Sequence, residues 1–82
     1  MVHVLKISPN YFKDVKSGVK SFEIRKNDRN YQVGDILILQ EYSPEFGYTT
    51  RQLLRYVTYL FDNSEYVKEG YVILGISGGD ER

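Results

Sequence analysis

Three residues in the first third of the chain carry groups from which a binding or catalytic site could be built: Lys20, Glu23 and Arg25. A lysine ammonium neutralises phosphate or, when partly desolvated, acts as a base. A glutamate accepts hydrogen bonds from a nucleobase or takes up a proton. The planar fork of arginine suits phosphate or a stacked base. These residue types could form either a binding site for a phosphate and a nucleobase or a catalytic site that transfers a proton.

Whether the three groups meet depends on where their strand begins. Residues 21–25 alternate polar and apolar, which is typical of a half-buried strand, so Glu23 and Arg25 share one face, opposite the apolar residues. Strict alternation places Lys20 on the face of Phe22 instead. Convergence therefore requires a strand that starts after Lys20, or a bulge. The alternative is a solvated face with ordinary cross-strand partners.

A polar connection follows this strand and brings amide, carboxylate and cationic groups close together: Lys26, Asn27, Asp28 and Arg29. Such a loop can read the edge of a nucleotide and hold its phosphate. The same residues are also plain turn formers, in which Asp28 only pairs with a neighbouring cation. The segment from Lys20 to Arg29 is thus the predicted working surface.

Three further residues are weaker candidates for the site. His3 alternates with apolar residues of the first strand, so it faces the barrel side or the mouth of a cleft, where a structural role is the commoner one. Tyr31 and Tyr48 stand in expected loops, and for that reason they are the tyrosines nominated as stacking platforms for bases.

The elements that position these groups follow from the apolar pattern. Ser8 and Pro9 form a helix start, Phe12, Val15 and Val19 recur at helical spacing, and Gly18 ends the helix. The β-type runs cover residues 2–7, 21–25, 36–39, 53–61 and 71–76, with loops at 43–48 and 62–70.

The resulting order of elements, β-α-β-β-β-β, predicts an α+β fold that is mainly β. We expect a small five-stranded β-barrel with one helix between strands 1 and 2, because closure removes exposed strand edges. The 82 residues make one domain, with residues 77–82 as a flexible tail.

Composition excludes several classes of function. The chain has no cysteine and one histidine, so we expect neither disulfides nor a metal site, and no motif indicates a cofactor. No apolar run approaches a membrane span, and the N-terminus enters a strand without a leader pattern, which favours a cytoplasmic protein.

Net charge is zero, yet residues 1–30 carry seven Lys and Arg against three acids. This asymmetry predicts a basic face, unless folding interleaves these charges with the acids of residues 31–82.

Residues 18–25 (GVKSFEIR) and the later Val33-Gly34-Asp35 resemble the ASCH branch of the PUA-like superfamily. The pattern of that branch is Gly-x-Lys-x-x-Glu-x-Arg, followed by Gly-Asp at the mouth of a strand. Residues 22–29 look like a subgroup of short bacterial and phage proteins known as a domain of unknown function. The resemblance covers residues 3–76 and implies a five-stranded PUA-like barrel with a cleft beside the first helix. It also implies binding of RNA or a modified nucleotide.

Three hypotheses about function remain open. The first is an RNA- or nucleotide-binding module that uses the cleft near residues 20–29. The second is a small amidohydrolase acting on an acylated nucleoside, as in one member of the wider ASCH group, with Lys20 as base and Glu23 as its proton partner. That enzyme has Thr at the position of Glu23, so this chain departs from its pattern. The third is a protein-interaction domain without catalysis, whose partner docks on the acidic region 41–69.

Overall fold

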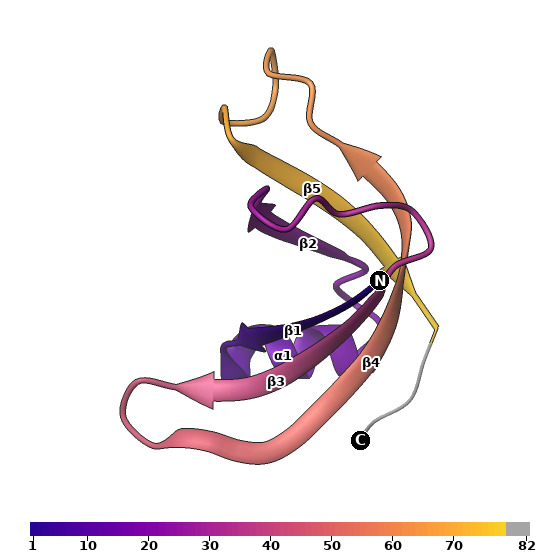
Figure 1. The fold of residues 1–82 in the computed structure, drawn as a ribbon. Helices are drawn as coiled ribbons and strands as arrows, with labels where there is room; N and C mark the ends of the chain where they lie inside the picture. The colour runs from indigo at the N-terminus through magenta and orange to yellow at the C-terminus, as the bar shows by residue number, and fades with distance from the viewer. Residues whose placement is uncertain (79–82) are drawn as a thin grey trace.

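The computed structural model of the protein describes residues 1–78. Within these residues the chain forms five strands and one helix, in the order that the sequence predicts (Figure 1). The elements are β1 (Val2–Ile7), α1 (Pro9–Ser17), β2 (Phe22–Lys26), β3 (Ile36–Ser43), β4 (Gly47–Phe61) and β5 (Tyr71–Ser77). Among the described residues, no helix is both long and apolar enough to cross a membrane.

The ends of α1 follow the sequence signals. Ser8 is the N-cap in extended conformation, with a proline in the first turn. Gly18 adopts φ 86°, and its N–H donates to the Val15 carbonyl at 3.1 Å. Phe12 and Val15 are fully buried, whereas Val19 is 81% exposed. The expectation that Val19 shares the apolar face is wrong, because the left-handed turn at Gly18 directs the chain away from the helix.

The five strands form one curled sheet in the order β1-β3-β4-β5-β2. β1 pairs with β3 in parallel, and the other pairs are antiparallel. Within residues 1–78 no ladder joins β1 to β2, so the sheet is a half-barrel that is open between them (Figure 1). The expected closure of the barrel is therefore wrong. We call this opening, with its two unpaired strand edges, the seam.

The curl of the sheet depends on the 15-residue strand β4. Its pairing with β5 shifts register between Val57 and Tyr59, which bends the strand locally. Gly75 lies opposite this irregularity. A Cβ atom there would lie 3.1 Å from Thr58 Oγ1 and 3.2 Å from Tyr59 Cβ, so glycine lets the two strands approach closely.

The concave face of the half-barrel carries the core. Its fully buried side chains come from α1 and from β3, β4 and β5, namely Phe12, Val15, Leu37, Leu39, Leu53, Val57, Val72 and Leu74. Side chains alternate along each strand, so the intervening residues of β1, β3 and β5 lie on the convex face. One apolar layer thus holds the sheet against α1.

Several strand boundaries differ from the sequence prediction. β3 and β4 extend until only residues 44–46 connect them, so Tyr48 lies in β4 and not in a loop. Ser77 belongs to β5 and not to a tail, and residues 79–82 of the expected tail lie outside the described residues. The β3–β4 hairpin therefore projects as a long arm (Figure 1).

Candidate functional site

β2 presents its polar side chains to the interior. Glu23 is 3% exposed, whereas Phe22 and Ile24 are 42% and 57% exposed. Glu23 lies opposite Leu74 of β5 in the ladder, on the concave face that holds the core. The predicted separation of polar and apolar faces is correct, but the interpretation of a solvated polar face is wrong for Glu23. An ionisable group in this position needs partners.

Glu23 is the centre of a three-residue ion cluster. Lys20 Nζ donates to Glu23 Oε1 at 2.7 Å, and Arg25 Nε donates to Glu23 Oε2 at 2.9 Å. β2 begins at Phe22, after Lys20, which meets the geometric condition for convergence. The structure therefore brings together the three residues that the sequence singles out. Two cations share one buried carboxylate, and each is held by charge-assisted hydrogen bonds.

The same two cations bind backbone carbonyls at the seam. Lys20 Nζ donates to the Phe22 carbonyl at 2.7 Å, and Arg25 Nη2 donates to the Lys6 carbonyl at 2.7 Å. The peptide of Ser21 pairs with β5, so by alternation the peptide of Phe22 faces the opposite, unpaired edge. Arg25 thus crosses from β2 to β1 and joins the two edges by a side chain in place of a ladder.

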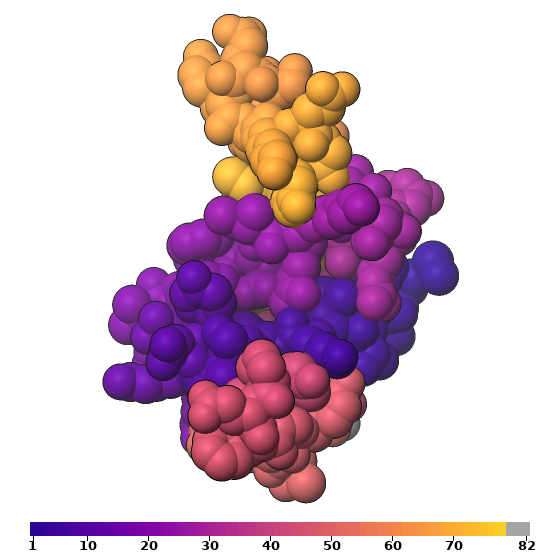
Figure 2. All heavy atoms as spheres, turned by 90° about the vertical axis from the view of Figure 1, so that its left-hand side faces the viewer, coloured from indigo at the N-terminus to yellow at the C-terminus, as the bar shows by residue number. Residues whose placement is uncertain are grey.

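A cleft with a volume of about 540 Å³ lies at the seam. β1 and the first turn of α1 line one side, and residues 20 and 22–25 line the other. Figure 2 looks onto this opening: the indigo atoms of β1 and α1 face the purple atoms of β2 across a hollow, with the β3–β4 turn below. The volume falls in the range of small-molecule sites.

The lining of the cleft combines positive charge with aromatic rings. It carries three cationic side chains, Lys6, Lys20 and Arg25, against the single carboxylate of Glu23. Lys20 Nζ lies 5.1 Å from the ring centre of Tyr11 and 4.7 Å from that of Phe22. At these distances the rings attract the ammonium and hold it at the mouth of the cleft.

Four residues of this lining lie outside the segment predicted from the sequence: Lys6, Ile7, Ser8 and Tyr11. Ser8 is the N-cap of α1, and its side chain makes no capping hydrogen bond. The helix start at Ser8 and Pro9 was readable from the sequence, and helix N-termini attract anions. That signal could have nominated Ser8 and Tyr11. The position of Lys6 in the cleft lining could not be predicted from the sequence, because it depends on β1 being an edge strand of the sheet.

The predicted loop at residues 26–29 does not take part in the cleft, and Lys26 is the last residue of β2 and not a loop residue. Lys26, Asn27, Asp28 and Arg29 are exposed, and none of them lines the cleft. The Asn27 N–H donates to the Gly70 carbonyl at 2.8 Å, and the Asp28 N–H donates to the Lys26 carbonyl at 2.9 Å. The first of these bonds fixes the loop to the β4–β5 connection, and the second is a local turn.

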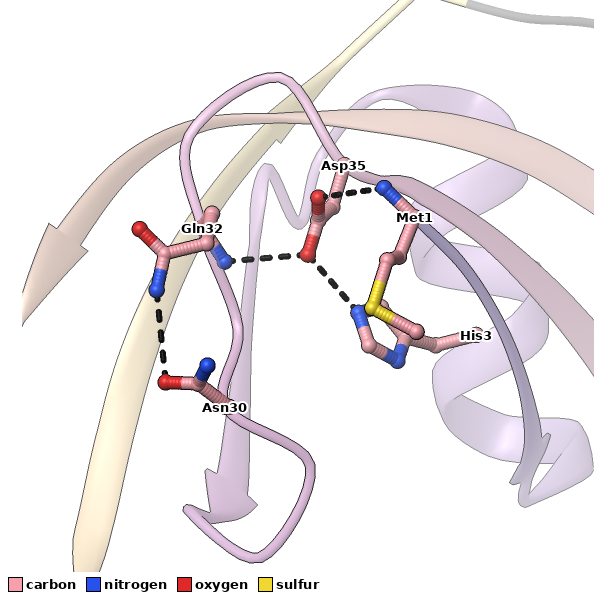
Figure 3. Close-up of polar contacts among 5 residues, drawn as sticks. All are labelled: Met1, His3, Asn30, Gln32 and Asp35. Atoms are coloured by element: carbon pink, nitrogen blue, oxygen red, sulfur yellow. Dashed lines mark hydrogen bonds and ion pairs between the residues drawn. The ribbon is translucent and has the colours of Figure 1, made fainter.

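His3 belongs to a second polar cluster, at the start of β1 (Figure 3). Asp35 accepts hydrogen bonds from the N-terminal ammonium of Met1 at 2.8 Å and from the Gln32 N–H at 3.0 Å. His3 Nε2 lies 2.7 Å from Asp35 Oδ2. His3 and Asp35 are 4% and 5% exposed. The cluster ties β1 to β3 and has no residue in the cleft lining, so its geometry is that of a structural support.

Tyr31 is buried, in contrast to its expected place in an exposed loop. It is 4% exposed and part of the core, and its ring centre lies 4.7 Å from that of His3. Burial raises the pKa of the Tyr31 hydroxyl, although the nearby Arg25 and Arg29 act in the opposite direction. Its ring therefore offers no open face for a base.

The Asp35 cluster predicts a specific dependence of stability on pH. The hydrogen bond from the N-terminal ammonium, supported by His3 and Gln32, lowers the pKa of Asp35 from 3.8 to about 2, against the opposing effect of burial. A carboxyl whose pKa is lower in the folded state stabilises the protein above its unfolded pKa, and this contribution is lost as pH falls towards the folded pKa. The stabilising effect is therefore present above pH 4 and disappears between pH 4 and pH 2.

Urea unfolding of Asp35→Asn at several pH values tests this expectation. At pH 7 the variant should be less stable than the parent by on the order of 1–2 kcal/mol, after allowance for solvent screening. The difference should shrink between pH 4 and pH 2. Asp28→Asn, an exposed loop carboxylate, is the matched control and should show a small difference at every pH. A constant difference for Asp35→Asn would contradict the assignment.

No three His, Asp or Glu side chains within residues 1–78 are grouped so that they could hold a metal ion. The groups available in the seam cleft are thus cations, one engaged carboxylate, the start of a helix and aromatic rings. Together they can bind an anion and contact a planar apolar group beside it.

Comparison with known proteins places the chain in a family. Residues 2–76 match the family model described as "Domain of unknown function (DUF3850)". The chain is also 40% identical over 73 residues to the "Uncharacterized 12.9 kDa protein in GpA 3'region" of Escherichia phage P2. This match covers 89% of the chain and 65% of the phage protein, so the chain spans slightly less than two thirds of its relative's length. The chain therefore belongs to the family of the domain of unknown function DUF3850.

Proposed function

We propose that the chain is a PUA-like domain of the ASCH type that binds RNA, with one nucleotide held in the seam cleft. The observation that carries this proposal is the pairing of Lys20 and Arg25 around the buried Glu23 at the mouth of an aromatic-lined cleft. The residues of the ASCH-like pattern, Gly-x-Lys-x-x-Glu-x-Arg, are the residues that build this arrangement. The half-barrel with a cleft beside α1 agrees with the architecture that the resemblance implies.

The cations of the cleft provide a site for the phosphate. Glu23 and the Lys6 carbonyl fix the Arg25 guanidinium in place, and among residues 1–78 none accepts a hydrogen bond from Nη1. A phosphate oxygen can take that position without displacing Glu23. The first turn of α1, at Ser8, lies on the opposite side of the cleft and adds the positive end of a helix.

The aromatic residues of the cleft provide a surface for the base. Tyr11 and Phe22 are 55% and 42% exposed, and both line the cleft. Each has a ring next to the Lys20 ammonium, so a base that stacks on either ring stays within reach of a cation. Stacking of this kind tolerates any base, and sequence preference then has to come from other contacts.

The contacts of Lys20 favour binding over amide hydrolysis. Its Nζ donates to both the Phe22 carbonyl and the Glu23 carboxylate, so Lys20 is placed as the cationic partner of a carboxylate. Glu23 is engaged on both oxygens by cations. Chromatography of acetylated cytidine after incubation with the protein distinguishes the two activities, because release of cytidine would favour the hydrolase.

Fluorescence anisotropy with a labelled single-stranded 12-nucleotide RNA tests the proposal. We expect binding at 50 mM salt that weakens steeply at 200 mM salt, because phosphate contacts release counterions. Lys20→Ala should weaken binding about five- to tenfold and lower the slope of log affinity against log salt by about 1. Lys68→Ala, which removes a lysine on the β4–β5 loop outside this cleft, is the matched control. No RNA binding at 50 mM salt, or equal losses in both variants, would overturn the proposal.

A further inference from the structure

We infer that the ligand is a single-stranded RNA of at least two nucleotides, and that the base next to the seam cleft stacks on Tyr48 of the β3–β4 hairpin. This inference rests on the proposed function, because it extends the same site. It assigns a role to a tyrosine pair that the cleft itself does not use. It also excludes a free mononucleotide and a continuous duplex as the preferred ligand.

A continuous set of contacts leads from the cleft to the hairpin. Lys6 lines the cleft, and its Nζ lies 4.3 Å from the ring centre of Tyr42 and 5.8 Å from that of Tyr48. Tyr42 and Tyr48 are directly opposite each other in the β3–β4 ladder, with ring centres 5.0 Å apart. Figure 2 shows the β3–β4 turn immediately beside the cleft opening.

The ring of Tyr48 is placed to receive a base. Tyr42 of β3 lies next to both Lys6 and Tyr48, and its ring contacts the Tyr48 ring at an interplanar angle of 60°. Tyr48 remains 53% exposed. A tyrosine that is fixed by its neighbour and exposed loses little rotamer freedom when a base stacks on it. Base–aromatic stacking is worth enough to be measured at a single residue.

Lys6 provides the charge between the two base positions. Its ammonium lies over the Tyr42 ring and near the Tyr48 ring, while its backbone carbonyl accepts a hydrogen bond from Arg25. Consecutive bases of RNA are joined by a phosphate that must lie between them. In the proposed complex, Lys6 contacts this phosphate, because Lys6 lies between the nucleotide in the seam cleft and the base stacked on Tyr48. A duplex keeps its bases stacked on each other and has none to offer Tyr48.

Competition against the labelled 12-nucleotide RNA tests the inference. An unlabelled trinucleotide should compete at least tenfold better than a nucleoside 5′-monophosphate, and single-stranded RNA should compete better than a 12-base-pair RNA duplex. Tyr48→Ala should weaken the trinucleotide about tenfold and leave the mononucleotide unchanged. Tyr48→Phe keeps the ring and should retain the affinity. Tyr66→Ala, an exposed tyrosine of the β4–β5 loop, is the matched control.

The outcomes separate this inference from the proposed function. RNA binding that depends on Lys20 but not on Tyr48 would overturn the inference and leave the proposed function standing. Equal competition by mononucleotide and trinucleotide, or by duplex and single strand, would do the same. An equal loss in Tyr66→Ala also contradicts it. Absence of any RNA binding overturns both. Thermal unfolding of each variant confirms that the losses do not come from unfolding.

Discussion

Replacement of Glu23 by alanine is expected to lower the free energy of unfolding by about 3 kcal/mol. The carboxylate is 3% exposed and is the shared partner of Lys20 and Arg25, whose side chains are 15% and 22% exposed. Its removal leaves two like charges together at the edge of the core, without the group that offsets their desolvation. The partial exposure of both cations lets them move towards water, which places the expected loss at the lower end of the range for buried ion pairs. Urea unfolding at pH 7 measures this change.

Companion variants identify the cause of that loss. Glu23→Gln keeps the shape but not the charge, so its loss should be intermediate. The triple variant Lys20→Met, Glu23→Leu and Arg25→Met replaces the whole cluster by apolar groups and should recover most of the stability, because no unpaired charge remains. Glu69→Ala, an exposed carboxylate of the β4–β5 loop, should change little. A loss below about 1 kcal/mol in Glu23→Ala would show that the cluster is not held by its carboxylate.

Arg25→Ala is expected to weaken RNA binding about 30-fold, the largest loss of any single cation. Hydrogen bonds to a charged group are worth about 1.5–3 kcal/mol each, and Arg25 is the residue placed to form them with a phosphate. Arg25 is also held in place before the ligand arrives, by Glu23 and the Lys6 carbonyl, so little side-chain entropy is lost on binding. Anisotropy titration with the labelled RNA at fixed salt gives the ratio directly.

A charge-conserving variant separates geometry from net charge in this result. Arg25→Lys retains the positive charge but not the planar fork, and should weaken binding about tenfold with a nearly unchanged salt slope. Arg29→Ala removes one charge from the exposed neighbouring loop and should cost less than threefold. If Arg29→Ala and Arg25→Ala weaken binding equally, RNA contacts the loop as much as the cleft, and the assignment of the phosphate site is incorrect.

Local patterns in the sequence predict most of the elements but not the faces of β2. The cap at Ser8, the left-handed Gly18 and the apolar runs locate α1 and the strands, although β4 begins six residues before the predicted 53–61. Alternation along residues 21–25 indicates a strand but not which side turns inward. That choice is made by the pairing of Glu23 with Leu74 of β5, a long-range contact that no local pattern contains.

The candidate site was also predicted only in part: residues within the local motif were identified, whereas residues placed by tertiary packing were not. The motif residues Lys20, Glu23 and Arg25 were identified from residue type and spacing, and they do meet. Lys6 and Tyr11 were missed, because they reach the cleft only through the unpaired edge of β1 and the packing of α1. Tyr31 was nominated as a loop residue, yet tertiary packing buries it against His3. Loop position alone therefore does not predict exposure in so small a protein.

The unpaired edges of β1 and β2 have a consequence for how copies of this chain behave towards one another. A bare strand edge is a template on which another molecule can add its own strand, and this is a common route to aggregation. Here a cationic side chain donates a hydrogen bond to a backbone carbonyl on each edge: Lys20 to the Phe22 carbonyl of β2, and Arg25 to the Lys6 carbonyl of β1. An incoming strand would have to displace both side chains and then sit beside their charge. The residues that we assign to ligand capture thus also protect the protein from self-association.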